Sequence, residues 1–524
     1  MTPFGNSAFL EHLTGAYRYA LPEMVLVGVA CLLFTLAAFG SSRCLSFAIA
    51  LAGVIGAAIV AATVVEQAVA EPAYAVLNPT NLAAFVRWIA LASLGLYIAL
   101  GWNEVKEHSA EYYACLLIAA AGLSLVGRAN DLVSLFLALE MLSIPTYVML
   151  YLPSANKRSQ EAALKYFMLS VLSSGILLFG FSYLYGLADS TNLVAISDTL
   201  VKAAKLGSIS PLAAIAAVMV IAGLGFRIAA VPFHFYAPDV YEAGPTGVVA
   251  QLAFMPKVAG FVALVRIFGL VGPVGGEIPF DSVRTLVPLT LWVIAAITMS
   301  LGNLLALVQD NVKRIFAYSG IAHAGYMMLG VLAACSVADA KGNATQAGID
   351  GLLIYLVAYG LMTVGAFAVL AHLNSNGRNV ETIDDLAGLG RSDPMAAGLM
   401  SIFLVSLIGL PLTAGFIGKF LLFWAAFDQP ADSPMGNMTR VLVAIAAVNA
   451  AIGAVYYLRA ASVMFLRAPL TPVEPSRLRP AFVAAAICAL GTLFFGIYPK
   501  PLVEFAGKAA PLNVPLDVRT LTGK

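Results

Sequence analysis

Charged residues are scarce in this chain. Only 11% of its 524 residues are Asp, Glu, Lys or Arg, and 61% are hydrophobic. A soluble domain carries about 25% charged residues, so the composition excludes a set of soluble domains. The net charge of +1 offers no attraction to nucleic acid or another polyanion. What remains is a polytopic membrane protein, all α-helical, embedded in a lipid bilayer.

Cysteines, nucleotide-binding loops and long connections are also sparse. The five cysteines are scattered, and none forms a CxxC pair, so neither a disulfide framework nor a metal site is indicated. The motifs GxGxxG and GxxxxGK[ST] do not occur, which leaves no cofactor site to expect. The first 20 residues lack the basic start and apolar centre of a cleaved signal. The longest loop, 374–393, is too short for a catalytic domain, so function is expected at membrane depth.

Long apolar segments make up most of the chain. A helix needs about 20 apolar residues to cross a bilayer, and by that measure the sequence predicts about fourteen spans. The expected spans are residues 21–39, 45–65, 82–101, 112–127, 131–152, 162–187, 211–232, 246–270, 286–308, 312–334, 350–373, 394–427, 440–465 and 480–498.

Basic residues in the loops predict the orientation. Loops with more Lys and Arg face the cytoplasm, and an even number of spans puts both termini on one side. One set of alternate loops holds Arg43, Lys106, Lys157, Arg158, Lys313, Arg314, Arg378, Arg391, Arg467, Arg477 and Arg479, and the other set holds Arg128, Lys202, Lys205, Lys341 and Arg440. The richer set is expected in the cytoplasm, and both termini on the outer, periplasmic side.

Several ionisable residues interrupt the apolar spans. A charge at the bilayer centre costs roughly 2.5–3.5 kcal/mol on insertion scales, so such a residue usually faces a protein interior or a hydrated cavity. A buried Lys whose carboxylate partner moves or is neutralised gains and loses a proton near neutral pH. The pattern therefore predicts a proton relay. Its candidate members are Glu140, Lys165, Arg227, Lys257, Lys419, His234 and His323.

Each candidate also has a structural interpretation. Lys165 lies four residues after Glu161, so the two could pair on one helix face while Lys165 snorkels to the interface. The deeper charges could form ion pairs that serve only the fold. Either histidine could be a satisfied core residue. Arg266, toward the end of its span, is expected to snorkel.

Two spans carry Gly and Pro in their interiors. They read "GLGFRIAAVPFH" at 223–234 and "GLPLTAGFIGKF" at 409–420. Helix breakers at membrane depth are tolerated where the freed backbone groups line a cavity or find partners, and interrupted spans in both halves of a transporter point to inverted repeats around a site. The expected divisions are an N-terminal part (1–111), two five-span halves (112–270 and 286–465) and a C-terminal span with its tail (466–524).

Five blocks of this sequence resemble, in order, the proton-translocating, antiporter-like membrane subunits of respiratory complex I, an NADH:quinone oxidoreductase. They include "NDLVSLFLALEMLSIPTYVMLYL", "GLGFRIAAVPFHFYAPDVYEAGPTGVVAQLAFMPKVAGF" and "SLIGLPLTAGFIGKF". The stretches "PDVYEAGPT" and "AALKYF" resemble the subunit N branch, the mitochondrial subunit 2 type. This resemblance implies fourteen helices, two inverted five-helix repeats with one broken helix each, and a hydrophilic axis along the membrane midplane.

The resemblance also implies roles. Glu140 matches the carboxylate that pairs with a neighbouring basic residue, and Lys165, Lys257 and Lys419 match lysines of the family. Arg227 stands where the family usually has Lys, and a guanidinium is effectively never deprotonated. We therefore expect Lys165 and Lys257 to carry the first-half proton beside a fixed charge at Arg227. Pro256 is expected to kink the helix before Lys257.

The resemblance implies a subunit that moves protons across a bacterial inner membrane. Redox chemistry with NADH, FMN, iron–sulfur clusters and quinone would occur in other subunits, with no redox site in this chain. The partners implied are neighbouring antiporter-like and small membrane subunits. Two alternatives stay open on the residues alone: a subunit of a multisubunit Na⁺/H⁺ antiporter, and a structural subunit that assembles without pumping.

Overall fold

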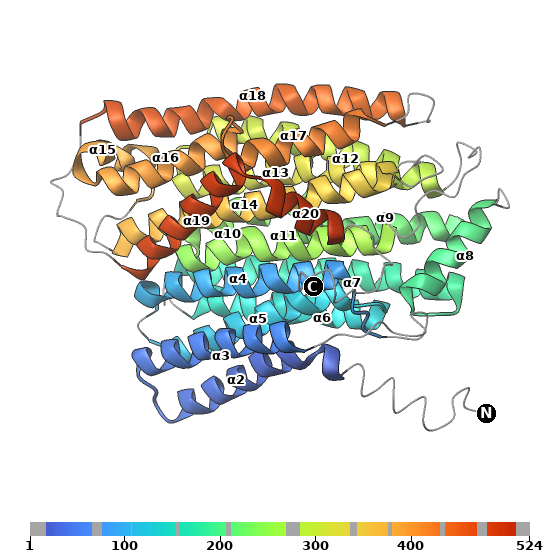
Figure 1. Ribbon diagram of the computed structural model, residues 1–524, viewed down its shortest axis with the longest axis horizontal. Coiled ribbons are helices and arrows are strands. Elements are labelled where there is room, and N and C mark those ends of the chain that lie inside the picture. Colours follow the sequence, from blue (N-terminus) through green and yellow to red (C-terminus); the bar gives the residue numbers. More distant parts are fainter. Residues whose placement is uncertain are drawn as a thin grey trace.

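The chain folds into a bundle of long, roughly aligned helices (Figure 1). The computed structural model describes residues 17–64, 76–105, 107–152, 157–205, 211–268, 283–335, 343–375, 380–429, 435–468 and 479–509. These residues form helices and a few isolated β-bridges, with no β-strand among them. The expected all-α fold is confirmed.

Fourteen crossings account for nearly all of the described residues. Twelve helices are long and apolar enough to span a membrane: α2 (Leu21–Ala38), α3 (Arg43–Thr63), α4 (Asn81–Glu104), α5 (Ser109–Arg128), α6 (Leu132–Tyr151), α7 (Lys157–Ala188), α11 (Thr246–Phe268), α12 (Val283–Leu307), α13 (Val312–Cys335), α14 (Asn343–Ser375), α18 (Gly436–Leu466) and α19 (Pro480–Ile497). Two divided crossings complete the set: α9 (Pro211–Arg227) with α10 (Tyr236–Ala243), and α16 (Pro394–Ile408) with α17 (Ala414–Phe427). Short helices connect or follow the crossings: α8 (Leu193–Lys205), η3 (Ile383–Leu386), α15 (Leu389–Ser392) and α20 (Lys500–Ala509).

Both spans with internal Gly and Pro are interrupted, as the sequence predicts. The second interruption begins at Gly409, whose φ of +90° ends α16 in the left-handed region that favours glycine. In the first, the freed amide of Val231 donates to the Thr298 hydroxyl of α12 at 3.1 Å, and the Tyr236 hydroxyl donates to the Phe226 carbonyl at 3.1 Å. Backbone groups released at membrane depth thus find partners inside the protein.

The two five-crossing halves run in opposite directions. The first comprises α5, α6, α7, α9–α10 and α11, and the second comprises α12, α13, α14, α16–α17 and α18. α5 starts at the end of the bundle where α15 lies, whereas α12 starts at the opposite end, near α8 (Figure 1). We call these the α15 end and the α8 end. An odd number of crossings in each half produces this inversion.

The most buried helices lie where the halves meet. All 23 residues of α11 are buried, and α13 and α14 are nearly as enclosed. α11 packs on α13 and α14, which join it to the second half. The outer helices α2, α3 and α18 leave large apolar side chains exposed, as a lipid-facing surface requires. α11 therefore places the charged residue Lys257 where the two halves meet.

α19 crosses the bundle obliquely and its end meets the second interruption (Figure 1). A Cβ at Gly496 would lie 2.4 Å from the Leu412 carbonyl oxygen and from Thr413 Cα. Only glycine permits this backbone contact. The last crossing therefore holds the α16–α17 interruption from outside.

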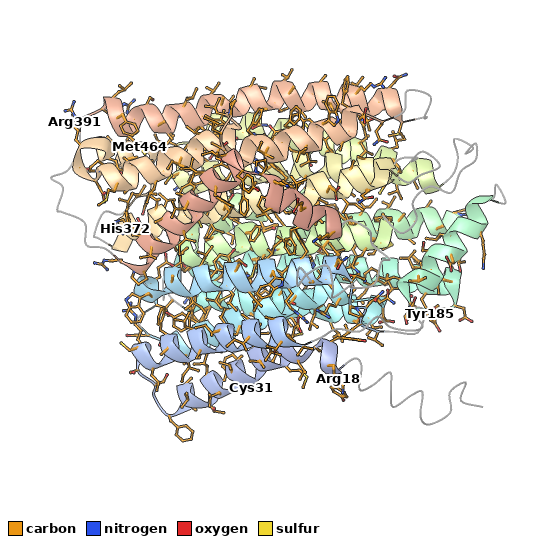
Figure 2. The ribbon with its side chains drawn as sticks, in the orientation of Figure 1. Arg18, Cys31, Tyr185, His372, Arg391 and Met464 are labelled. Atoms are coloured by element: carbon orange, nitrogen blue, oxygen red, sulfur yellow. The ribbon has the colours of Figure 1, made fainter. Side chains whose placement is uncertain are left out.

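Loop cations gather at the α15 end. Arg391 and His372 lie at that end and Tyr185 at the other (Figure 2). The described members of the richer set all lie at or next to helix termini of the α15 end: Arg43, Lys157, Arg158, Lys313, Arg314, Arg391, Arg467 and Arg479. Lys106, Arg378, Arg477 and Lys341 fall outside the described residues, as does the Lys205 side chain. The basic residues are thus concentrated at one end of the bundle.

Candidate functional site

Glu140 and Arg227 form an ion pair in the first half. α6 carries Glu140, and Arg227 is the last residue of α9, where the first broken helix is interrupted. Arg227 Nη2 lies 2.7 Å from Glu140 Oε1, and the Ser174 hydroxyl donates to the same oxygen at 2.6 Å. Arg227 Nη1 donates to the Leu139 carbonyl at 3.0 Å and to the Ser143 hydroxyl. This ring of acceptors suits a permanent positive charge.

Lys165 lies outside this buried region. Its side chain, near the start of α7, is 44% exposed, and Nζ lies 2.8 Å from Glu161 Oε1 and 3.1 Å from Asp239 Oδ2. Arg314 also binds Asp239, at 2.9 Å, and Glu242, at 2.9 Å. The i, i+4 pair proposed as the structural alternative is therefore present. It belongs to a surface network that links α7, α10 and α13 at the α15 end.

Lys257 occupies the middle of α11. Its side chain is only 2% exposed, and Nζ lies 5.9 Å from the centre of the Tyr359 ring on α14. Gly320 of α13 leaves room for both groups, because a Cβ there would lie 2.9 Å from the Tyr359 hydroxyl and 3.4 Å from Lys257 Nζ. Pro256 remains inside one continuous helix rather than ending it. Among the described residues, no carboxylate pairs with this ammonium group.

Lys419 of α17 reaches back across the second interruption. Its Nζ donates to the carbonyls of Leu407 at 2.7 Å and Ile408 at 3.0 Å, the last two residues of α16. The carboxyl end of a helix carries partial negative charge and unsatisfied carbonyls, so an ammonium group is stabilised there. Nζ also lies 5.3 Å from the centre of the Tyr326 ring. The broken helix thus supplies the partner that a lone Lys in an apolar span requires.

His323 of α13 is held through both of its ring nitrogens. Nδ1 is hydrogen-bonded to the Tyr355 hydroxyl of α14, and Nε2 lies 3.1 Å from the Tyr457 hydroxyl of α18. Tyr457 is in turn hydrogen-bonded to Ser319. The imidazole therefore connects hydroxyl groups from two different helices.

Aromatic rings join His323 to both buried lysines. The centre of its ring lies 5.5 Å from that of Tyr359, which faces Lys257, and 5.5 Å from that of Tyr326, which faces Lys419. We call these five residues the central row. It runs from α11 through α14 and α13 to α17, and so connects the two halves.

No sequence signal singled out the tyrosines of this site. Tyrosine is common in apolar spans, so its presence there predicts nothing specific. Two weak hints exist: Tyr355 and Tyr359 are four residues apart, and Tyr326 follows His323 by three, so each pair shares a helix face. Their meeting around one histidine depends on the packing of α13 against α14.

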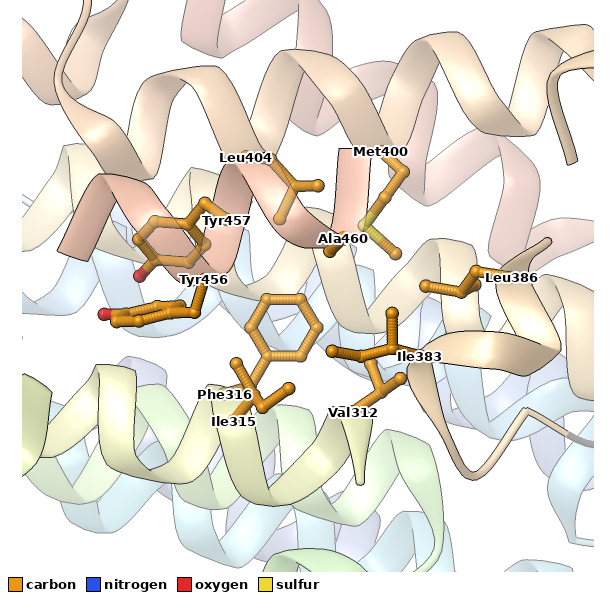
Figure 3. Close-up of a pocket in the computed structure, with 10 residues that line it drawn as sticks. All are labelled: Val312, Ile315, Phe316, Ile383, Leu386, Met400, Leu404, Tyr456, Tyr457 and Ala460. Atoms are coloured by element: carbon orange, nitrogen blue, oxygen red, sulfur yellow. The ribbon is translucent and has the colours of Figure 1, made fainter. Parts of the chain in front are cut away.

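An apolar pocket lies beside this site, under η3 (Figure 3). Its walls are Val312, Ile315, Phe316, Ile383, Leu386, Met400, Leu404, Tyr456, Tyr457 and Ala460. Both tyrosine hydroxyls point away from Val312 and Leu386 (Figure 3). The lining provides no charged group that could hold a metal ion or an anion.

His234 is not joined to the central row. It lies in the first interruption, 6% exposed, with its ring 4.5 Å from the Phe235 ring, and its Nδ1 is buried with no hydrogen-bond partner in the described part of the chain. Within the described residues, no hydrogen bond or ring contact connects it to His323 or Lys257. Of the two candidate histidines, only His323 is placed between lysines.

Arg266 does not snorkel, contrary to the sequence expectation. It is 5% exposed and donates to the Gly127 carbonyl of α5. It sits in the enclosed helix α11, so its end of the span is covered by protein rather than lipid. Nearby on α2, Glu23 accepts two hydrogen bonds from Arg87, at 2.9 and 2.8 Å, a buried pair that the sequence did not reveal.

The geometry suits proton exchange. Ammonium, imidazole and phenol groups can pass protons along hydrogen bonds or water, whereas the guanidinium of Arg227 cannot. Charges at this depth are rare and mark ion pathways. The fold and the central row define an antiporter-like membrane protein, in which two inverted half-bundles with one interrupted helix each surround a polar axis.

Similarity to known proteins agrees with this class. The family model for the membrane region of NADH:quinone oxidoreductase and Mrp antiporter subunits matches residues 129–465. NADH-quinone oxidoreductase subunit N 1 of Koribacter versatilis is 37% identical over 518 residues, covering 95% of this chain and 96% of the relative. Subunit N of an Anaeromyxobacter species is 38% identical over 438 residues, covering 81% and 82%. The chain belongs to the NADH:quinone oxidoreductase/Mrp antiporter family, in its subunit N branch.

Solved structures show the same fold. A chain of respiratory complex I from Thermus thermophilus with bound aureothin superposes with a TM-score of 0.72 at 30% identity, covering 93% of this chain and 99% of that one. A chain of the Mrp complex from Dietzia sp. superposes with a TM-score of 0.76 at 20% identity, covering 94% and 97%. The second likeness shows the fold alone.

Proposed function

We propose that this chain is a proton-translocating membrane subunit of a bacterial NADH:quinone oxidoreductase, of the subunit N type. Electron transfer from NADH to quinone, with its flavin and iron–sulfur clusters, takes place in other subunits and drives protons through this one. The observation that carries the proposal is the central row, two buried lysines joined by a histidine and two tyrosines at membrane depth. Neighbouring membrane subunits of the complex and lipid surround this chain.

The residues divide into carriers and fixed charges. Lys257, His323 and Lys419 carry protons between the halves. Arg227 is the fixed positive charge paired with Glu140, and that pair couples this chain to its neighbour. Lys165 stands in the surface network of the α15 end, so we assign it to charge coupling there rather than to the row. His234 lines the first interruption without contacting the row.

The α15 end faces the cytoplasm in this proposal, and both termini face the periplasm. The concentration of loop cations at that end supports this orientation. The proposed divisions at 1–111, 112–270, 286–465 and 466–524 then describe an N-terminal part, two half-channels and a C-terminal crossing. Cysteines placed at Arg391 and Tyr185, in a background lacking the five native cysteines, test the orientation. A membrane-impermeant maleimide added to intact cells should label only the second.

The test of function is the proton-to-electron ratio of the assembled complex. Lys257→Met and Lys419→Met remove the buried ammonium groups with little change in volume, and each should lower the ratio. Lys202→Met on α8 is the matched control because its side chain is exposed and away from the row. If both buried-lysine variants assembled with the wild-type ratio, the chain would be a structural subunit.

A multisubunit Na⁺/H⁺ antiporter is the second candidate, because the family includes both assemblies. Relatives of the subunit N type at 37–38% identity favour the oxidoreductase. Purification through an affinity tag on this chain separates the two. The oxidoreductase predicts a complex that contains flavin and iron–sulfur clusters, and the antiporter predicts neither.

A further inference from the structure

One face of α4 turns polar as the helix approaches the α15 end. Tyr97, Gly101 and Glu104 recur at i, i+4 and i+7, so they lie on the same side of the helix. Tyr112 of α5 packs directly on this face, because a Cβ at Gly101 would lie 2.4 Å from its ring. A carboxylate and two phenols are thus aligned at the junction of α4 and α5.

The first turn of α11 meets the same face. The Gly247 amide donates to Glu104 Oε2 at 2.6 Å, and a Cβ at Gly247 would lie 3.3 Å from the Tyr112 hydroxyl. Lys313 Nζ, which donates to the Gly244 carbonyl at 2.8 Å, provides the nearby positive charge. Glu104 is therefore a carboxylate with one backbone donor and a nearby ammonium group, and it stands at the start of α11.

The face leads toward Lys257. Tyr97 lies close enough to Tyr112 and to Tyr359 to interact electrostatically with both. Tyr359 shares the space beside Gly320 with Lys257 Nζ. From its first turn to Lys257, α11 rises about 15 Å, and Tyr97, two turns before the end of α4, lies at an intermediate depth.

Two hydroxyls along this path have no hydrogen-bond partner among the described residues. They belong to Tyr97 and Tyr112, and both residues are fully buried. Buried polar groups in native proteins are nearly always satisfied, by protein or by internal water. Two orphaned hydroxyls at the junction of α4 and α5 therefore indicate internal water, which typically makes about three hydrogen bonds to such groups.

We propose that a file of water molecules runs from Glu104 past Tyr112, Tyr97 and Tyr359 to Lys257, and delivers protons to Lys257 from the α15 end. Glu104 takes the proton from solvent and passes it to the first water, and successive O–H bonds break and form until the Lys257 amine is protonated. Glu104 returns to the carboxylate. This path rests on the proposed function, because it supplies the carrier named there.

Substitutions that remove one oxygen test the path in the assembled complex. Tyr97→Phe deletes the mid-path hydroxyl, and Glu104→Gln deletes the proton acceptor while keeping an oxygen for the Gly247 amide. Tyr113→Phe is the matched control: its hydroxyl is also buried without a partner among the described residues, and its ring packs on Phe47 of α3. Its ring also contacts that of Tyr112, with the centroids 5.5 Å apart, so the control keeps the same neighbours and removes only an oxygen that the path does not use. Lys257→Met supplies the reference loss in the same membranes.

We expect Tyr97→Phe and Glu104→Gln to lower the proton-to-electron ratio as far as Lys257→Met does, with Tyr113→Phe at the wild-type value. Wild-type ratios in both path variants beside a loss in Lys257→Met would overturn the path and leave the proposed function standing. A wild-type ratio in Lys257→Met would overturn both. Should Glu104→Gln fail to assemble, Tyr97→Phe decides, because it removes no bond within the protein.

A cryo-EM map of the intact complex that resolves solvent is the second test. Ordered water within hydrogen-bond distance of the Tyr97 and Tyr112 hydroxyls would support the file. Dry apolar contacts around both hydroxyls would refute it.

Discussion

Arg227 Nη2 and Glu140 Oε1 lie 2.7 Å apart, and this pair distinguishes the first half of the bundle from the second. In the second half, Lys419 occupies the interrupted helix and binds only the carbonyls at the end of α16 among the described residues. One half thus has a permanent charge with a carboxylate partner. The other has an ammonium group stabilised by a helix end, which is able to lose its proton.

Breaking the pair should be more harmful than removing it. Glu140→Gln leaves the 4%-exposed guanidinium of Arg227 without its counter-charge, and breaking a buried pair typically costs about 3–5 kcal/mol. Because Glu140 is 20% exposed, we expect the lower end of that range. The double variant Arg227→Met/Glu140→Gln should recover part of the loss. Melting temperatures of the purified complex measure this cycle, and additive losses would show that the two residues are not coupled.

Lys165→Gln should have little effect on stability. Exposed ion pairs contribute about 1 kcal/mol or less, and Asp239 keeps its contact with Arg314. The melting temperature should therefore stay close to that of the wild type, and the proton-to-electron ratio should fall less than in Lys257→Met. A loss of pumping as large as that of Lys257→Met would show that Lys165 is itself a proton carrier.

The hydroxyl groups that hold His323 should be needed for transfer between the halves. Tyr355→Phe leaves Nδ1 without its partner, at a cost of about 1–3 kcal/mol, and it should slow proton-coupled turnover. Tyr456→Phe is a suitable control because its hydroxyl donates to Asn303 at 3.0 Å rather than to the histidine. Equal slowing in both variants would indicate a general packing defect. Steady-state NADH oxidation in sealed vesicles, with and without an uncoupler, provides the measurement.

Gly496→Val should distort the second interruption. A side chain at this position collides with the backbone of Leu412 and Thr413, and backbone cannot move aside as a flexible side chain would. We expect a lower yield of assembled complex and a displaced Lys419. Gly398→Ala is the control, since nothing lies within 4 Å of a Cβ there and alanine favours a helix by about 1 kcal/mol. Normal assembly and pumping in Gly496→Val would show that α19 does not support the break.

Much of this architecture could be predicted from local patterns. Apolar segments of spanning length located the crossings, and Gly with Pro at 223–234 and 409–420 located both interruptions. The lysines at 257 and 419 were found because an ammonium group is conspicuous in an apolar run. These signals lie within single helices, where spacing and composition are sufficient.

The partners of those residues could not be predicted in the same way. Arg266 was expected at the interface, but α11 lies at the centre and protein covers its end. His234 and His323 looked equivalent in the sequence, yet only His323 contacts the tyrosines that face both lysines. Residues far apart in the chain are brought together by helix packing, which leaves no local signal.

The sequence by itself determined that the chain crosses a membrane many times, because apolar length and scarce charge allow no other environment. It also determined which helices break, and it singled out Lys257 and Lys419 as buried ammonium groups. Only the tertiary structure decided which of these charges share one interior. The reason is physical: a buried ammonium group needs a helix end, an aromatic face or water within a few ångströms, and helices from both halves must pack together to supply them.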